Sequence, residues 1–321
     1  MKLSLLSCGQ ALGKRVLDNN YFASYLDTTD QWIRERSGIV TRYWVEDEST
    51  LDLAAAAAAD CLGKLQGFDR SRISVVICAS ISTDEAVPAV SAMLQKELDL
   101  DTDIMTFDLN AACSGFVYGL EVARNLLCTR PPGSCALVVG AERLSRTIDP
   151  NDRSSCFLFG DGAGASLWTL SAGKEDYFAA KTIGQRDMLS VGHSEPISMD
   201  GRAVFRFAVT EMSEVIRKVL AQASLPANAV DLYILHQANQ RIIDAIMREL
   251  QLPAERFPTN IERCGNTSSA SIGILLDELF SSGQLDGQKT LCLAGFGGGM
   301  SCGAILLKGH EIAERILDLC G

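Results

Sequence analysis

The sequence contains no apolar run near the roughly 18 residues that a membrane-spanning helix requires. Its first residues, MKLSLLSCGQALGKRV, lack the long apolar core and small-residue cleavage site of a secretory signal. Because both features are missing, we expect a cytoplasmic protein without a membrane partner.

Basic charge is also scarce, because 29 Lys and Arg stand against 40 Asp and Glu and leave a formal net charge of −11. Nucleic-acid binding depends on a dominant basic surface that contacts phosphates. The charge balance therefore predicts no nucleic-acid partner, and an anionic partner would need a local basic patch. One candidate patch lies between residues 202 and 248, where six basic residues accompany four acidic ones.

The eleven cysteines form no C-x-x-C pair and show no regular framework spacing. This pattern excludes the usual structural zinc motifs, predicts no metal site and favours reduced thiols. Five cysteines stand in apolar runs and are expected in the core: Cys8, Cys61, Cys78, Cys135 and Cys292.

Cys113 has a different setting, in the stretch DLNAACSGF between a strand-like and a helix-like run. A packed cysteine needs no such neighbours. A nucleophile does, because small residues give access and a helix N-terminus lowers the thiol pKa. Cys113 is therefore a candidate nucleophile.

Short apolar segments alternate with segments of helical periodicity along the chain. The expected strands cover residues 73–80, 134–141, 156–160, 230–236, 289–296 and 303–308. The expected helices cover residues 50–65, 209–223 and 239–250. This alternation predicts an α/β protein with a largely parallel, buried sheet.

The spacing of these segments repeats weakly. A strand centred on Ile77 precedes the helix start at Cys113 by about 36 positions, and one centred on Ile234 precedes a similar start at Ser269 by about 35. The repeat predicts two similar halves, residues 1–170 and 171–321.

Four stretches at expected strand ends carry residue choices that packing does not explain: NAACSGF, LHQANQR, RCGNTSSASIG and GFGGGMS. Singly, each has an ordinary structural explanation, such as a turn or a helix cap. Reactive groups in α/β proteins gather at strand C-termini, and together these stretches supply a thiol, an imidazole, a carboxamide and free backbone amides. That combination favours acyl transfer through a thioester.

The ordered set ACSGF, GDGAGA, HQAN, GNTSSAS and GFGGG resembles the thiolase superfamily, and within it the β-ketoacyl-acyl carrier protein synthase III family. The likeness extends to DTTDQWIRERSGIVTRY (27–43) and DPNDRSSCFLFGDGAGA (149–165), so it covers essentially the whole chain. The resemblance implies a five-layered α-β-α-β-α sandwich of two duplicated halves and a homodimer. It also implies an enzyme that starts fatty-acid synthesis from acyl-CoA and malonyl-acyl carrier protein, without a further cofactor.

The resemblance assigns roles to the candidate residues. Cys113 would take the acyl group, and His236 and Asn266 would hold the malonyl thioester carbonyl while CO₂ leaves. The backbone N–H groups of Cys113 and Gly298 would form the oxyanion hole.

The binding residues follow from the same resemblance. Acyl-CoA would contact Thr28, Trp32, Arg36 and Arg153, with Trp32 and Arg36 as an aromatic–guanidinium clamp for the adenine. The carrier channel would be bordered by Gln237, Ala238, Asn239, Gln240 and Arg241. Val87 stands where family members often carry a Phe that lines the partner's acyl pocket, so the primer's length and branching stay open.

Other functions are also open at this point. A condensing enzyme of the hydroxymethylglutaryl-CoA synthase type would need a carboxylate base, for which Asp84 and Glu85 are candidates. An acyltransferase of secondary metabolism is a second alternative. A dinucleotide-dependent oxidoreductase is disfavoured because the glycines do not follow G-x-G-x-x-G, and a scaffold without activity would leave Cys113 unreactive.

Overall fold

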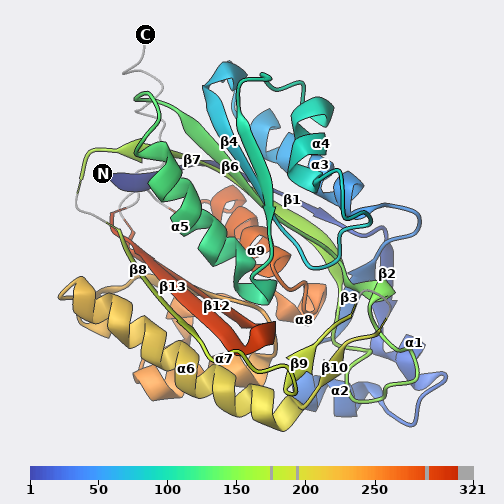
Figure 1. Ribbon diagram of the computed structural model, residues 1–321. Helices are drawn as coiled ribbons and strands as arrows, with labels where there is room; N and C mark the ends of the chain where they lie inside the picture. Colours follow the sequence, from blue (N-terminus) through green and yellow to red (C-terminus); the bar gives the residue numbers. More distant parts are fainter. Residues whose placement is uncertain (174–175, 193–194, 286–288, 310–321) are drawn as a thin grey trace.

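The computed structural model describes residues 1–173, 176–192, 195–285 and 289–309, and it is built around two sheets (Figure 1). The first sheet has the strand order β1 (Lys2–Leu12), β7 (Asp161–Ser171), β6 (Cys135–Arg143), β4 (Ile73–Ala79) and β5 (Met105–Leu109). The second has the order β11 (Leu232–Leu235), β12 (Leu291–Gly297), β13 (Ser301–Leu307) and β8 (Tyr177–Thr182).

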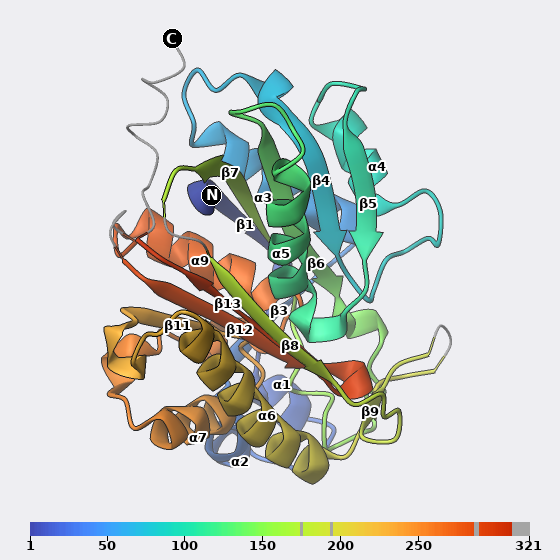
Figure 2. The same ribbon diagram turned by 60° about the vertical axis from the view of Figure 1, so that its left-hand side comes forward.

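Helices cover both sheets and fill the space between them. Helices α3 (Thr50–Gly63) and α4 (Val90–Glu97) cover the outer face of the first sheet, and α6 (Gly201–Gln222) and α7 (Gln240–Leu250) cover the second. Helices α5 (Gly115–Leu127) and α9 (Ala270–Ser281) lie between the sheets and share one apolar core with both (Figure 2). The predicted five-layered α-β-α-β-α sandwich is confirmed.

Smaller elements gather near one end of the central layer (Figure 1). They are β2 (Arg15–Asp18), α1 (Asn19–Ala23), α2 (Asp30–Ser37), β3 (Thr41–Trp44), β9 (Leu189–Ser190), β10 (Ser198–Met199) and α8 (Ile261–Cys264).

The glycines of the GDGAGA stretch serve packing. A Cβ at Gly164 would lie 2.3 Å from the Gly273 carbonyl carbon, so strand β7 and helix α9 touch backbone to backbone. A side chain at either position would force the two layers apart.

Two sequence-based expectations are wrong. The sheets are mixed: β4 is parallel to β5 and β6, and β11 to β12, whereas the remaining pairs are antiparallel. Residues 156–160 form turns with a single bridge from Phe159 to Asn266, because the strand begins only at Asp161. Apolar content alone did not separate a buried loop from a buried strand.

Other expectations agree with the structure. All five cysteines predicted in apolar runs are buried. The first sheet uses strands between residues 2 and 171 and the second between 177 and 307, while the division into halves 1–170 and 171–321 stays a prediction. Within the described residues, no helix combines the length and apolar character needed to cross a bilayer.

Candidate active site

A cavity of about 1830 Å³ opens at the ends of the two sheets, and Cys113, His236, Asn266 and Gly298 all line it. Cys113 lies in a short 3₁₀ turn (Ala112–Ser114) between β5 and α5. Ala112, with φ +48°, holds a conformation that non-glycine residues rarely adopt, and such strain is typical of functional turns.

The second sheet reaches the backbone of Cys113 through glycine. A Cβ at Gly297 would lie 2.5 Å from the Cys113 nitrogen, and one at Gly295 would lie 3.2 Å from its carbonyl oxygen. Gly298 follows directly, and a Cβ there would be 3.8 Å from that of Ala112. The backbones of Cys113 and Gly298 therefore border the same part of the cavity.

The expected lowering of the Cys113 pKa is wrong. Burial raises the pKa of the thiol to about 12, and the nearby Glu142 carboxylate adds to the rise. Cys113 stands in the 3₁₀ turn ahead of α5, and loss of water on burial is the largest cause of the rise. The resting group at neutral pH is a thiol, which needs a base to become a nucleophile.

His236 follows β11, and its ring is held from one side. Its Nδ1 is 2.7 Å from the Ser271 hydroxyl, and its backbone N–H donates to the Ala294 carbonyl at 2.8 Å. The Phe296 ring stands edge-on, with ring centroids 5.5 Å apart. Burial lowers the pKa of His236 to about 3, so its imidazole is neutral at pH 7 and one ring nitrogen carries a free lone pair.

Asn266 is oriented by its own loop. Its Oδ1 accepts from the Ser268 backbone N–H at 2.9 Å, and its backbone N–H donates to the Leu158 carbonyl at 2.8 Å. Because the carboxamide oxygen is occupied, the Nδ2 group is the part left to donate, and donation does not require titration.

Trp32 and Arg36 lie at the cavity mouth, and Arg153 packs on the Trp32 ring from outside the cavity lining. The guanidinium of Arg153 is 5.1 Å and that of Arg36 is 5.5 Å from the Trp32 ring, so both contact the indole. Trp32 and Arg36 line the cavity, whereas Arg153 and Thr28 do not. The Thr28 hydroxyl is buried and has no hydrogen-bond partner among the residues that the structure describes.

The segment expected to border the carrier channel, residues 237–241, contains both buried and exposed side chains. Gln237 is fully buried, donating to the Leu235 carbonyl and accepting from the Asn260 N–H, so it offers no surface to a carrier and that expectation is corrected. Ala238 is buried against the cavity, and the Gln240 amide donates to Asp244.

Two residues of that segment face the mouth. Asn239 caps α7 and donates to the Arg36 carbonyl at 3.0 Å, which ties this helix to the Trp32 helix α2. Arg241 is exposed, lines the cavity and lies 5.9 Å over the Phe205 ring.

Val87 is 81% exposed and does not line its own chain's cavity. Part of the apolar cavity wall comes instead from residues outside the quoted motifs: Leu144, Leu189, Met199, Val204 and Phe205. Sequence analysis missed these residues because apolar loop positions resemble core positions.

Comparison with known proteins agrees with this geometry. The 3-oxoacyl-acyl-carrier-protein synthase III family model matches residues 107–185, and the C-terminal model of that family matches residues 220–309. The β-ketoacyl-acyl-carrier-protein synthase III of Streptococcus suis is 40% identical over 316 residues, spanning 92% of this chain and 96% of that protein.

The chain belongs to the β-ketoacyl-acyl carrier protein synthase III family. The Aquifex aeolicus 3-oxoacyl-acyl-carrier-protein synthase III structure superposes with a TM-score of 0.90 and 36% identity, over 95% of this chain and 99% of that one. The priming β-ketosynthase of the R1128 polyketide pathway superposes with a TM-score of 0.89 and 31% identity, over 97% of each chain. The predicted family, acyltransferase class and thiolase fold are thus confirmed.

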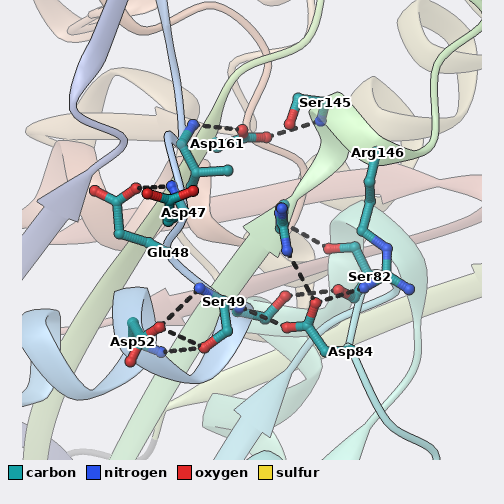
Figure 3. Close-up of polar contacts among 12 residues, drawn as sticks. Asp47, Glu48, Ser49, Asp52, Ser82, Asp84, Ser145, Arg146 and Asp161 are labelled. Atoms are coloured by element: carbon teal, nitrogen blue, oxygen red, sulfur yellow. Dashed lines mark hydrogen bonds and ion pairs between the residues drawn. The ribbon is translucent and has the colours of Figure 1, made fainter.

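Asp84, a candidate base for the hydroxymethylglutaryl type of reaction, is engaged elsewhere in this synthase III chain (Figure 3). Its carboxylate pairs with Arg146 at 2.6 Å and Arg143 at 3.3 Å, and it accepts from the Thr50 N–H at 2.7 Å. Glu85 is exposed on the cavity wall. No group of metal-binding side chains occurs among the residues that the structure describes.

Glu142 is a buried acid that sequence analysis missed. Its carboxylate accepts from the Ser82 hydroxyl at 2.6 Å and the Ser269 hydroxyl at 2.7 Å, and from the Ile81 N–H at 3.2 Å. Burial raises its pKa. Because Ser82 follows β4 and Ser269 precedes α9, Glu142 joins the first sheet to the loop that carries Asn266.

Glu142→Ala should lower the free energy of unfolding by about 2–4 kcal/mol, because it leaves buried donors unpaired and opens a cavity. Thermal unfolding followed by circular dichroism measures the loss. Glu255→Ala, at an exposed position, is the control. An unchanged Tm for Glu142→Ala would remove Glu142 as a link between the layers.

The raised pKa of Cys113 predicts a steep pH dependence of alkylation by iodoacetamide. Only the thiolate reacts, and far below a pKa of about 12 its fraction rises tenfold per pH unit. Peptide mass spectrometry should therefore show the Cys113 rate climbing without a plateau from about pH 7 to 10, with the exposed Cys128 as internal comparison. A plateau below pH 8 would show that the resting enzyme holds a thiolate.

Proposed function

We propose that the chain catalyses the decarboxylative Claisen condensation of an acyl-CoA primer with malonyl-acyl carrier protein, through an acyl group on Cys113. The carrying observation is that a thiol, a neutral imidazole and an oriented carboxamide line one cavity together with Trp32 and Arg36.

In the first half-reaction the Cys113 sulfur attacks the acyl-CoA thioester carbon while His236 accepts the thiol proton. The carbon–sulfur bond to CoA then breaks, and CoA leaves with that proton. Negative charge on the carbonyl oxygen meets the backbone N–H groups of Cys113 and Gly298.

In the second half-reaction malonyl-carrier loses CO₂, and the bonding electron pair moves into an enolate. His236 and Asn266 donate hydrogen bonds to the oxygen on which the charge collects. The enolate carbon attacks the acyl–Cys113 carbon, the carbon–sulfur bond breaks as β-ketoacyl-carrier forms, and the Cys113 thiolate takes a proton from water.

The test is reconstitution with purified malonyl-carrier and an acyl-CoA panel, in which CO₂, free CoA and β-ketoacyl-carrier should appear in equal amounts. CoA release without CO₂ would indicate a condensation that retains the carboxylate. The polyketide relative leaves both primary and secondary metabolism open as the source of the carrier.

We further propose a cytoplasmic homodimer in which Val87 completes the partner's acyl pocket. The high exposure of Val87 on its own chain supports this arrangement. A smaller side chain than Phe would admit longer or branched primers.

The carrier is expected to dock beside Arg241, whose exposed guanidinium borders the cavity. Arg241→Glu should raise the apparent KM for malonyl-carrier about tenfold, and more at low salt, because rim charges mainly steer encounter. Acylation by acyl-CoA without carrier is the control reaction. An unchanged KM for the carrier would place docking elsewhere.

A further inference from the structure

Among the described residues, the Ser271 hydroxyl makes the one side-chain hydrogen bond of the His236 ring, at 2.7 Å from Nδ1. Both residues are buried. Ser271 stands in the first turn of α9, five positions after Asn266, so one segment carries Asn266 and the partner of the His236 ring.

The two half-reactions need opposite forms of the neutral His236 ring. To accept the Cys113 proton at Nε2, the ring must carry its own proton on Nδ1. To donate from Nε2 to the malonyl carbonyl, the neutral ring must instead have a free lone pair on Nδ1. A fixed backbone N–H or carbonyl at Nδ1 would favour only one of these forms.

A hydroxyl accommodates both forms because it carries one proton and two lone pairs. One lone pair of the Ser271 oxygen accepts from the Gln237 backbone N–H at 3.3 Å. The other lone pair and the proton remain for Nδ1, and rotation about the C–O bond exchanges them. The resting ring is neutral because its pKa is far below 7, and it is cationic only while it holds the Cys113 proton.

We propose that Ser271 is a positioning residue that holds His236 in either neutral tautomer, accepting from Nδ1–H during acylation and donating to Nδ1 during decarboxylation. This proposal rests on the proposed function. It explains why a side-chain hydroxyl occupies this buried place.

The kinetic experiment compares Ser271→Thr with Ser271→Val, which have the same shape and differ in the hydroxyl. Acyl–Cys113 formation is followed by rapid-quench mass spectrometry, and CO₂ release is followed with malonyl-carrier alone. Ser271→Val should slow both half-reactions by about 10- to 100-fold relative to Ser271→Thr. Loss in only one half-reaction, or equal rates for the two variants, would overturn the proposal.

Ser269→Ala is the matched control, because its buried hydroxyl lies in the same segment but contacts Glu142 and the Ala79 carbonyl. Ser269→Ala should lower Tm. It should not slow both half-reactions to the same extent, which is the effect expected of Ser271→Val relative to Ser271→Thr. The same matched slowing in Ser269→Ala would show that Ser271 acts only through packing.

A spectroscopic measurement is independent of turnover. The His236 signals in ¹⁵N-histidine spectra are assigned by their absence from the spectrum of His236→Ala. In the wild type, the Nδ1 and Nε2 chemical shifts of His236 should report both neutral tautomers. A pure Nε2–H signal would contradict the proposal even in an active enzyme. Conversely, an inactive enzyme with both tautomers would overturn the proposed function and leave the ring's behaviour intact.

Discussion

Replacing Cys113 with alanine is expected to abolish acyl transfer, by a factor on the order of 10⁴ or more, while the fold persists. No other group in the cavity replaces the sulfur that carries the acyl chain between the two half-reactions. Cys113 is half-buried and alanine is smaller, so the tight approach of Gly297 is undisturbed. The Tm should change by only a few degrees.

Cys113→Ala is expected to keep the decarboxylation half-reaction. Because His236 and Asn266 remain in place, Cys113→Ala should still release CO₂ from malonyl-carrier, within about an order of magnitude of the wild-type enzyme. Cys128→Ala, at an exposed cysteine, should retain full transfer. Acyl-enzyme formation by Cys113→Ala would assign the nucleophile to a different residue.

The second large effect is expected at His236 and Asn266. Removing either donor should slow malonyl decarboxylation by about 100- to 1000-fold, because the enolate charge loses one of two fixed hydrogen bonds. Acylation of Cys113 should fall less, and least for the Asn266 variants, since Asn266 takes no part in moving the thiol proton.

Asn266→Asp separates orientation from donation. An aspartate keeps an oxygen to accept from the Ser268 N–H but replaces the Nδ2 donor with negative charge. It should therefore decarboxylate more slowly than Asn266→Ala while the loop stays ordered. Equal loss of acylation and decarboxylation in these variants would contradict the separate roles.

Much of the site could be predicted from sequence because Cys113, His236 and Gly298 sit in motifs that follow strands, and strand C-termini bring such positions together whatever the loops between them. Asn266 lines the same cavity from the loop between helices α8 and α9, so the expected strand before it is absent. Glycines within a short motif also indicate where two backbones approach closely, as the glycines beside Cys113 show.

Properties that depend on distant packing were not predictable in the same way. The thiol pKa was expected to fall with the helix dipole, but burial raises it. Gln237 belongs to the HQAN motif yet points into the core, and Glu142 gains its role only from serines far away in sequence. Strand direction likewise depends on connections that local periodicity does not encode.

Intact-protein mass spectrometry after incubation with straight and branched acyl-CoAs, without carrier, tests the central claim most directly. The expected result is a mass gain equal to one acyl group in the wild type, absent in Cys113→Ala, with the extent of labelling identifying the primer. No gain with any acyl-CoA, or an equal gain in Cys113→Ala, would contradict acyl transfer through Cys113.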